Sequence, residues 1–274
     1  MIKKIAVGMI ALSIATLTLV GCGSKANEDM DTKENEDITI MDTKENEDIT
    51  IMDTKENEDV IIMGTNAEFM PFEYRDGKEV VGFDVDIANK IAEKLGKELK
   101  IVDMKFAGLI AALESGKIDF IAAGMSKNPK REKQVNFSDS YYTANQLITV
   151  KADNTDIISG DDLKGKRIGV QLGTTGEELA KEIEGTTVVS FDKGAMAIMD
   201  LANGKVDAVV LDSEPTKNYT KDNDDVKVLD EELTEEEYSI AISKDNQELL
   251  DTINETLKEL KESGEYQEMV NKYF

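Results

Sequence analysis

Several charged or hydroxyl-bearing side chains follow predicted strands and could bind a small charged molecule. Arg131 closes a short segment, residues 124–131, which also contains Gly124, Met125 and Ser126. A guanidinium binds a planar carboxylate through two parallel hydrogen bonds, although a surface arginine is more often simply solvated. The segment therefore predicts either one end of an anion site or an ordinary charged loop.

Residues 171–178 follow a second predicted strand and open a helix. The N–H groups at a helix start attract anions, and Gln171, Thr174 and Thr175 lie beside them in the sequence. A capping box from Thr175 to Glu178 explains the same residues without any ligand. Both interpretations remain open at this point.

Asp212 ends a third predicted strand, residues 206–211. Its carboxylate could hold an ammonium group, or it could cap the helix that begins near Ser213. The aromatic-rich loop of residues 64–74 follows a fourth strand and could form either local core or a ligand wall. Ligands in open α/β sheets bind outside the carboxyl ends of the strands. Together the four segments predict one cleft for the zwitterion of an α-amino acid.

The composition excludes much of the usual enzyme chemistry. The 274 residues contain no histidine and one cysteine, which removes Ser-His-Asp and Cys-His catalysis, histidine-containing metal sites, intramolecular disulfides and cysteine clusters. We therefore expect no catalytic residue, metal or cofactor. The net charge of −25, from 32 basic and 57 acidic residues, argues against a nucleic-acid partner.

Apolar runs typical of strands alternate with helical patterns from about residue 60 to residue 274. This alternation predicts an α/β fold with mostly parallel sheets. The units Leu113–Phe120 and Leu201–Ala208 share one order of helix end, glycine, lysine, aspartate and strand. The repetition favours two similarly built lobes with a cleft between them. An ordinary glycine-containing connection from a helix to a strand produces the same pattern.

The first residues have the pattern of a targeting segment. Two lysines precede an uncharged apolar stretch, residues 5–20, which predicts a signal peptide over residues 1–21. The tetrapeptide Leu19-Val20-Gly21-Cys22 resembles the lipobox of bacterial lipoproteins. This resemblance implies acylation of Cys22 and a lipid anchor on the outer side of the cell membrane.

An acidic repeat follows. Residues 30–40 recur identically at 41–51, and 52–62 form a third, slightly different copy. Residues 23–59 hold fourteen acids and four lysines. So charged a segment buries too little apolar surface to offset its chain entropy, so we expect residues 22–59 to be a disordered stalk. A short ordered element and a binding epitope are the alternatives.

Six stretches resemble the polar amino-acid-binding proteins of ABC importers, solute-binding protein family 3. They are GTNAEFMPFEY, VGFDVDIANKIAEKLG, AALESGKIDFIAAGMSKNPKREKQVNFSDSYY, DLKGKRIGVQLGTTGEE, NGKVDAVVLDSEP and SGEYQEMVNKYF. The resemblance implies a periplasmic-binding-protein-like fold of type II, with the ligand in the cleft between two lobes that two hinge strands connect. The implied boundaries are residues 60–149 plus 241–274 for lobe 1 and 150–240 for lobe 2, with crossings near 147–150 and 238–242.

The resemblance also implies roles for individual residues. The expected ligand-carboxylate contacts are Arg131, with the loop Gly124, Met125 and Ser126, and Thr174 and Thr175 with Gln171 beside them. Asp212 is the expected ammonium partner, and Phe69 and Phe106 are the expected aromatic walls.

Two residues bear on the ligand's side chain. Asn66 lies where many family members carry an aspartate that contacts a cationic side chain. A neutral amide argues for an uncharged polar ligand such as glutamine or cystine, but Glu68, two residues on, could restore the charge. Lys130 and Ser140 also depart from the family pattern, at positions that look peripheral.

The expected function is binding without catalysis. The resemblance implies an extracytoplasmic, lipid-anchored and monomeric protein that captures a free polar amino acid by lobe closure and delivers it to the membrane subunits of an ABC permease. One alternative is a sensor or adhesin component that uses the same ligand trap. The other is an enzyme of the dehydratase type on the same fold.

Overall fold

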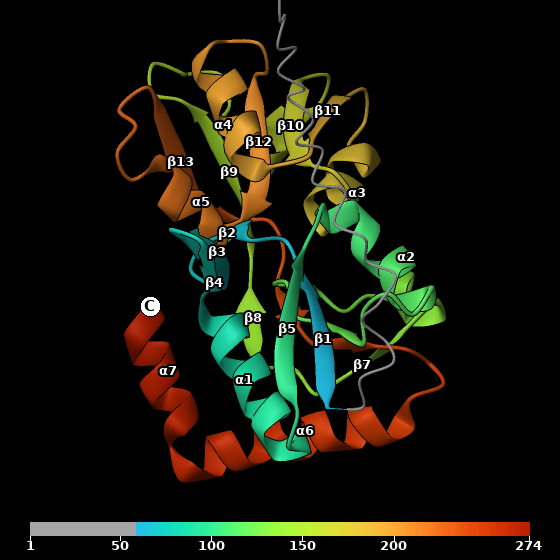
Figure 1. Cartoon of the computed structure of the whole chain (residues 1–274). Coiled ribbons are helices and arrows are strands. Elements are labelled where there is room, and N and C mark those ends of the chain that lie inside the picture. The colour runs from blue at the N-terminus through green and yellow to red at the C-terminus, as the bar shows by residue number, and fades with distance from the viewer. Residues whose placement is uncertain (1–58) are drawn as a thin grey trace, which may run out of the picture. The chain divides into compact units, whose positions relative to one another are not determined.

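Two five-stranded sheets with the same strand pattern form the core of residues 59–274, which are the residues that this computed structural model describes (Figure 1). The order in the first sheet is β5 (Glu98–Asp103), β1 (Val60–Thr65), β6 (Phe120–Ile121), β15 (Ala241–Ile242) and β7 (Asn136–Phe137). The order in the second is β11 (Thr187–Phe191), β10 (Arg167–Gln171), β12 (Ala208–Asp212), β9 (Gln146–Lys151) and β13 (Val226–Glu232). The first three strands of each sheet are parallel, and the fourth runs antiparallel to both its neighbours. The predicted α/β fold with two similar lobes is confirmed.

Helices pack on the faces of both sheets (Figure 1). Those of lobe 1 are α1 (Phe83–Leu95), α2 (Leu109–Glu114), α6 (Gln247–Ser263) and α7 (Glu265–Tyr273). Those of lobe 2 are α3 (Thr175–Glu182), α4 (Gly194–Ala202) and α5 (Ser213–Thr220). Apolar residues three and four apart bury one face of α1, which ends at Gly96 in the left-handed conformation, as its sequence pattern predicts.

The two repeated sequence units attach equivalent strands. Gly116 after α2 and Gly204 after α4 have φ angles of 69° and 70°, which favour glycine. The carboxylates of Asp119 and Asp207 each accept a hydrogen bond of 2.8 Å from a backbone N–H of the neighbouring strand, β1 or β10. The repeated pattern thus places β6 and β12 at the same position in their sheets.

The lobes are joined by a two-stranded antiparallel ribbon of β8 (Tyr142–Ala144) and β14 (Glu236–Tyr238). The crossing predicted near 147–150 is therefore too late, because those residues belong to β9 and pair with β12 inside the second sheet. The predicted end of lobe 2 at residue 240 is also late, since β14 already forms the ribbon. An apolar run such as that of β9 is expected both in a strand that crosses between lobes and in a strand inside a sheet. The local sequence pattern therefore does not distinguish the two positions.

The aromatic-rich loop of residues 64–74 contributes both to the local core and to the wall of the cavity. It folds into a small sheet of β2 (Glu68–Phe69), β3 (Glu73–Asp76) and β4 (Glu79–Val81), which was not predicted. Phe72 is fully buried and packs edge-on against Phe83 and Tyr238, so it is core. Phe69, three residues earlier, lines the cavity described below.

The predicted signal peptide, the acylated Cys22 and the acidic stalk up to residue 58 lie outside the described residues. Within residues 59–274, no helix has the length and apolar character needed to cross a membrane.

Candidate functional site

A narrow cavity between the lobes brings together nine of the twelve predicted ligand-binding residues. They are Phe69, Phe106, Gly124, Ser126, Arg131, Gln171, Thr174, Thr175 and Asp212. The volume open to the centres of water molecules is about 10 Å³, roughly the room of one water. The side chains of both lobes therefore nearly fill the cavity in this conformation.

Arg131 supplies the positive charge of the cavity. It opens the short 3-10 helix Arg131–Lys133, and the Asn128 side chain accepts its backbone N–H over 2.8 Å. The guanidinium is buried, lies 5.4 Å from the centre of the Phe106 ring, and donates to the carbonyls of Ser126 (2.5 Å) and Gly173 (3.0 Å). Burial lowers the pKa of Arg131, while nearby carboxylates oppose that shift.

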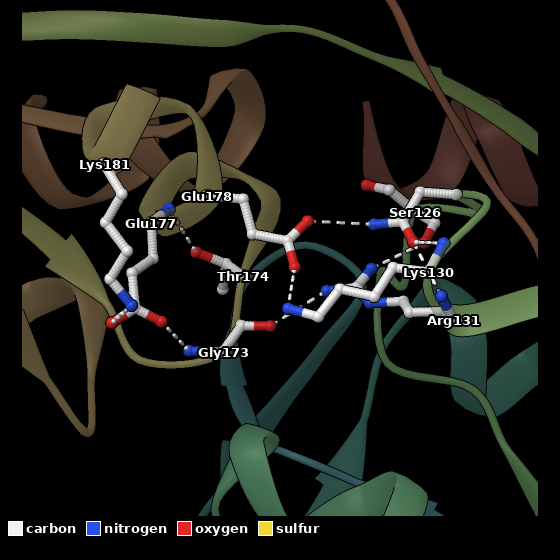
Figure 2. A network of polar contacts seen from close by, with 9 residues as sticks. Ser126, Lys130, Arg131, Gly173, Thr174, Glu177, Glu178 and Lys181 are labelled. Carbon is white, nitrogen blue, oxygen red and sulfur yellow. Dashed lines mark hydrogen bonds and ion pairs between the residues drawn. The ribbon is translucent and has the colours of Figure 1, made fainter. Parts of the chain in front are cut away.

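The start of α3 faces Arg131 from the other lobe, as Figure 2 shows. Its cap is Thr174, whose hydroxyl accepts the N–H of Glu177 (3.3 Å), and not Thr175. The predicted capping box from Thr175 to Glu178 is therefore wrong by one residue. Glu177 reaches back to accept the N–H of Gly173 (2.8 Å). This arrangement frees the Thr175 hydroxyl from capping.

Asp212 supplies a negative charge at the carboxyl end of β12. It occupies the N-cap position of α5, but its side chain makes no capping bond. Its Oδ1 instead accepts the phenol O–H of Tyr238 over 2.7 Å, and the side chain is 3% exposed. Burial and the nearby Glu236 carboxylate raise the pKa of Asp212 from 3.8 to about 7. The capping alternative for this carboxylate is therefore not realised in the structure.

Gly124 lets the loop after β6 approach the aromatic wall. Its φ is 50°, and a Cβ there would lie 2.6 Å from the Phe69 ring. Its N–H donates to the buried Asp84 over 2.9 Å. Gly124 and Ser126 line the cavity. The side chain of Met125, between them in the sequence, packs in the core of lobe 1 instead.

Asn66 and Glu68 also lie outside the cavity lining and connect the lobes instead. Asn66 Nδ2 donates to the carbonyl of Met104 (2.9 Å), and its Oδ1 accepts from Gln171 Nε2 (2.9 Å). Glu68 forms a 2.5 Å ion pair with Lys193 of lobe 2. Both ends of the Asn66 amide are therefore engaged by the protein in this conformation.

Further ion pairs cross the mouth of the cleft. Lys130 pairs with Glu178 at 2.5 Å, and Lys105 pairs with Asp192 at 2.7 Å (Figure 2 shows the first). Lys130, a departure from the family pattern that looked peripheral, thus contacts the opposite lobe. These contacts describe a closed pair of lobes.

Glu236, in the ribbon strand β14, is a residue of the site that sequence reasoning missed. Its carboxylate accepts hydrogen bonds from Ser126 of lobe 1 and from Thr175 of lobe 2. It stands in a run of five acids within residues 231–237, and nothing in the sequence separates it from its neighbours. Its position depends on the pairing of two distant strands, β8 and β14.

The cavity thus offers donors from Arg131 and acceptors from Asp212 in one narrow space. Residues 61–274 match the family model described as bacterial extracellular solute-binding proteins, family 3. The chain belongs to this family. The match covers the whole part of the chain in which the two lobes lie.

Several named proteins and solved structures are similar to this chain over most of their length. The arginine-binding extracellular protein ArtP of Bacillus subtilis is 40% identical over 216 residues, which cover 77% of this chain and 84% of ArtP. The crystal structure of a substrate-binding protein of an amino acid ABC transporter is 47% identical, with a TM-score of 0.75, over 78% of this chain and 99% of the other. The structure of an ancestral arginine-binding protein bound to glutamine is 43% identical, with a TM-score of 0.73. The match covers 80% of this chain and 99% of the ancestral protein. The predicted type II two-lobe fold is confirmed by these likenesses.

Within residues 59–274 of this family 3 protein, the structure contains no group of three or more cysteine, aspartate and glutamate side chains arranged to hold a metal ion. The polar groups at the cavity are instead paired donors and acceptors. Such a set can bind and orient a zwitterion.

Proposed function

We propose that this chain is an extracytoplasmic, lipid-anchored binding protein that captures an L-α-amino acid by lobe closure and delivers it to an ABC permease. One observation carries the proposal. A buried guanidinium from lobe 1, Arg131, and a buried carboxylate from lobe 2, Asp212, line the same interlobe cavity. These two charges complement the carboxylate and ammonium of an amino acid.

In this proposal Arg131 and the N–H groups that start α3 bind the ligand carboxylate. Arg131 uses two of its five N–H donors on the carbonyls of Ser126 and Gly173, one in each lobe. The ligand therefore joins groups that already meet across the cleft. Because a ligand shifts a two-state equilibrium only by its differential affinity, contacts from both lobes favour the closed form.

The proposal also specifies the side chain of the ligand. One similar ancestral protein is bound to glutamine, which is the uncharged type of ligand expected from Asn66. ArtP is named for arginine, and the two carboxylates at the site, Asp212 and Glu236, outnumber its one guanidinium, Arg131. An extra cationic group on the ligand would be attracted by that excess of negative charge. We therefore put L-arginine first and L-glutamine second.

Calorimetric titration tests the binding step. The full chain in detergent, stripped of bound small molecules and refolded, is titrated with the twenty amino acids, cystine and ornithine. We expect tight binding of one of them, lost in Arg131→Ala and Asp212→Asn and kept in Arg167→Ala, a half-exposed arginine of lobe 2 paired with Asp207. Binding of none of these compounds would overturn the proposed function.

Two further experiments test delivery and anchoring. Co-purification of the closed, liganded chain with permease subunits separates transport from a sensor role, which shares the same binding step. Cys22→Ala is expected to release the chain from the membrane and to abolish fatty-acid labelling. Retention of the label in that variant would contradict the anchor at Cys22.

A further inference from the structure

Three hydroxyl groups surround the carboxylate of Glu236. Its Oε2 accepts from Ser126 Oγ and from Thr175 Oγ1 (2.7 Å), and its Oε1 accepts from Thr234 Oγ1 (3.0 Å). A carboxylate can only accept hydrogen bonds, so each of these three hydroxyls is the donor. Glu236 itself is half-buried and is not among the residues that line the cavity.

This arrangement decides where the hydroxyl hydrogens of Ser126 and Thr175 point. A hydroxyl has one hydrogen and two lone pairs, and it rotates to suit its neighbours. Both hydrogens are given to Glu236, so each oxygen can offer only lone pairs to the cavity that it lines. One lone pair of Thr175 already accepts Gln146 Nε2 at 3.3 Å, and the hydroxyl retains a second.

We propose that Glu236 is a positioning residue that holds the hydroxyls of Ser126 and Thr175 as acceptors for the N–H groups of the ligand's ammonium. This inference rests on the proposed function and deepens it. Asp212 on the same cavity adds a third acceptor side chain. Arg131 and the N–H groups at the start of α3 are the donors. The site then admits the zwitterion in one orientation.

The inference changes the role of two predicted residues. Ser126 and Thr175 were expected to contact the ligand carboxylate. A carboxylate also only accepts hydrogen bonds, so it gains nothing from two hydroxyl oxygens whose hydrogens point away. Carboxylate recognition through these residues is then left to backbone N–H groups and to Arg131.

The test compares a ligand with its analogue that lacks the ammonium. The full chain in detergent is titrated with L-arginine and with 5-guanidinopentanoic acid, and in parallel with L-glutamine and 4-carbamoylbutanoic acid. Glu236→Leu removes the acceptor and frees the hydroxyls to rotate. It is expected to weaken binding of the amino acid by about tenfold or more, and binding of the analogue by less than about threefold.

Matched variants separate positioning from damage to the fold. Glu236→Gln keeps an acceptor oxygen toward both hydroxyls and is expected to restore most of the amino-acid affinity. Glu237→Leu, at the next and exposed position of β14, is expected to leave both affinities unchanged. If Glu236→Leu does not fold, Ser126→Ala and Thr175→Val are tested instead. Each removes one acceptor, so each should weaken binding of the amino acid and leave the affinity for the analogue almost unchanged.

Two outcomes would overturn the inference in different ways. Equal losses for the amino acid and its analogue in Glu236→Leu, with normal binding by the wild-type chain, would show that Glu236 only supports the fold or the closed state. Failure of the wild-type chain to bind any amino acid would remove the proposed function and the inference with it.

Discussion

Tyr238 donates its phenol hydrogen to Asp212 Oδ1 over 2.7 Å, and both side chains are buried. Tyr238 ends β14, so this bond joins the interlobe ribbon to the carboxylate that the proposed site uses for the ligand ammonium. A hydrogen bond to the charged form of a carboxylate lowers its pKa, which here opposes the effect of burial. The hinge therefore helps to keep Asp212 ionised.

Tyr238→Phe is expected to raise the pKa of Asp212 further and to weaken amino-acid binding near pH 7 by about tenfold. Affinity should recover as the pH rises above 7, because Asp212 then ionises even without the phenol. Calorimetry over this pH range measures both effects. Tyr266→Phe, which removes a hydroxyl bonded to the carbonyl of Tyr141 within lobe 1, is the control. A loss that does not vary with pH would contradict the role of the Tyr238 hydroxyl.

Asp212 links binding to pH in the wild-type chain. Its pKa is about 7 in the folded protein, mainly because of burial, so a growing share is protonated below pH 7. A protonated acid attracts an ammonium weakly. We expect the affinity for an amino acid to fall by up to about tenfold for each pH unit below 7. Calorimetry in buffers of different ionisation enthalpy should also detect proton release on binding near pH 7.

Asp212→Asn is expected to abolish tight binding and yet to stabilise the unliganded chain. A carboxyl whose folded pKa is raised from 3.8 to about 7 contributes stability that is complete at low pH and is lost as the pH rises through 7. The neutral amide avoids this loss, so the variant should be more stable than the wild type by up to about 4 kcal/mol at pH 8 and by almost nothing around pH 4. Thermal unfolding at both pH values measures the difference. Lower stability of the variant at pH 8 would contradict the argument.

Glu73 and Asp84 form a buried pair of carboxyls behind the Gly124 loop. Asp84 Oδ2 accepts from Gly124 N (2.9 Å) and from Tyr141 (2.7 Å), and both acids are fully buried. Burial raises the pKa of Asp84 to about 6, and burial together with Asp84 raises the pKa of Glu73 well above 4.5. Two nearby buried carboxyls cannot both be ionised at low cost, so we expect Glu73 to be the one that keeps its proton.

Glu73→Gln replaces that protonated acid by a neutral donor of the same shape. The wild-type chain should lose stability as the pH rises from about 4.5 through the folded pKa of Glu73, and the variant should not. The difference in melting temperature, measured from about pH 4.5 upward, is expected to grow in favour of the variant. Glu79→Gln, an exposed site in the same small sheet, should give parallel curves. Parallel curves for Glu73→Gln as well would contradict a protonated Glu73.

Sequence reasoning succeeded where the signal is local and failed where it depends on pairing between distant segments. The helix α1 and its stop at Gly96 follow from apolar spacing and one glycine. Arg131 and Asp212, which both line the cavity, were predicted because each follows a strand in a motif of fixed order. Glu236 was missed because its place is set by the pairing of β14 with β8, about ninety residues earlier in the chain. The cap at Thr174 was missed by one residue because adjacent threonines are equally good N-caps.

Gly173 is the point of close approach between the lobes. Its φ is 82°, its carbonyl accepts from Arg131 (3.0 Å), and a Cβ there would lie 3.0 Å from the Cα and Cβ of Ala107. Gly173→Ala therefore strains the backbone and pushes the closed lobes apart. We expect it to weaken amino-acid binding by about tenfold, mainly through faster dissociation.

Gly77→Ala is the matched control for this prediction. Gly77 also has a positive φ, 61°, but no heavy atom lies within 4 Å of its added Cβ. The two variants share the strain of a left-handed alanine and should lower the melting temperature by similar amounts. Only Gly173→Ala adds a clash that exists in the closed state alone. Surface plasmon resonance with an immobilised chain measures the dissociation rates. Equal dissociation rates in the two variants would mean that Gly173 and Ala107 do not approach each other this closely in the liganded protein.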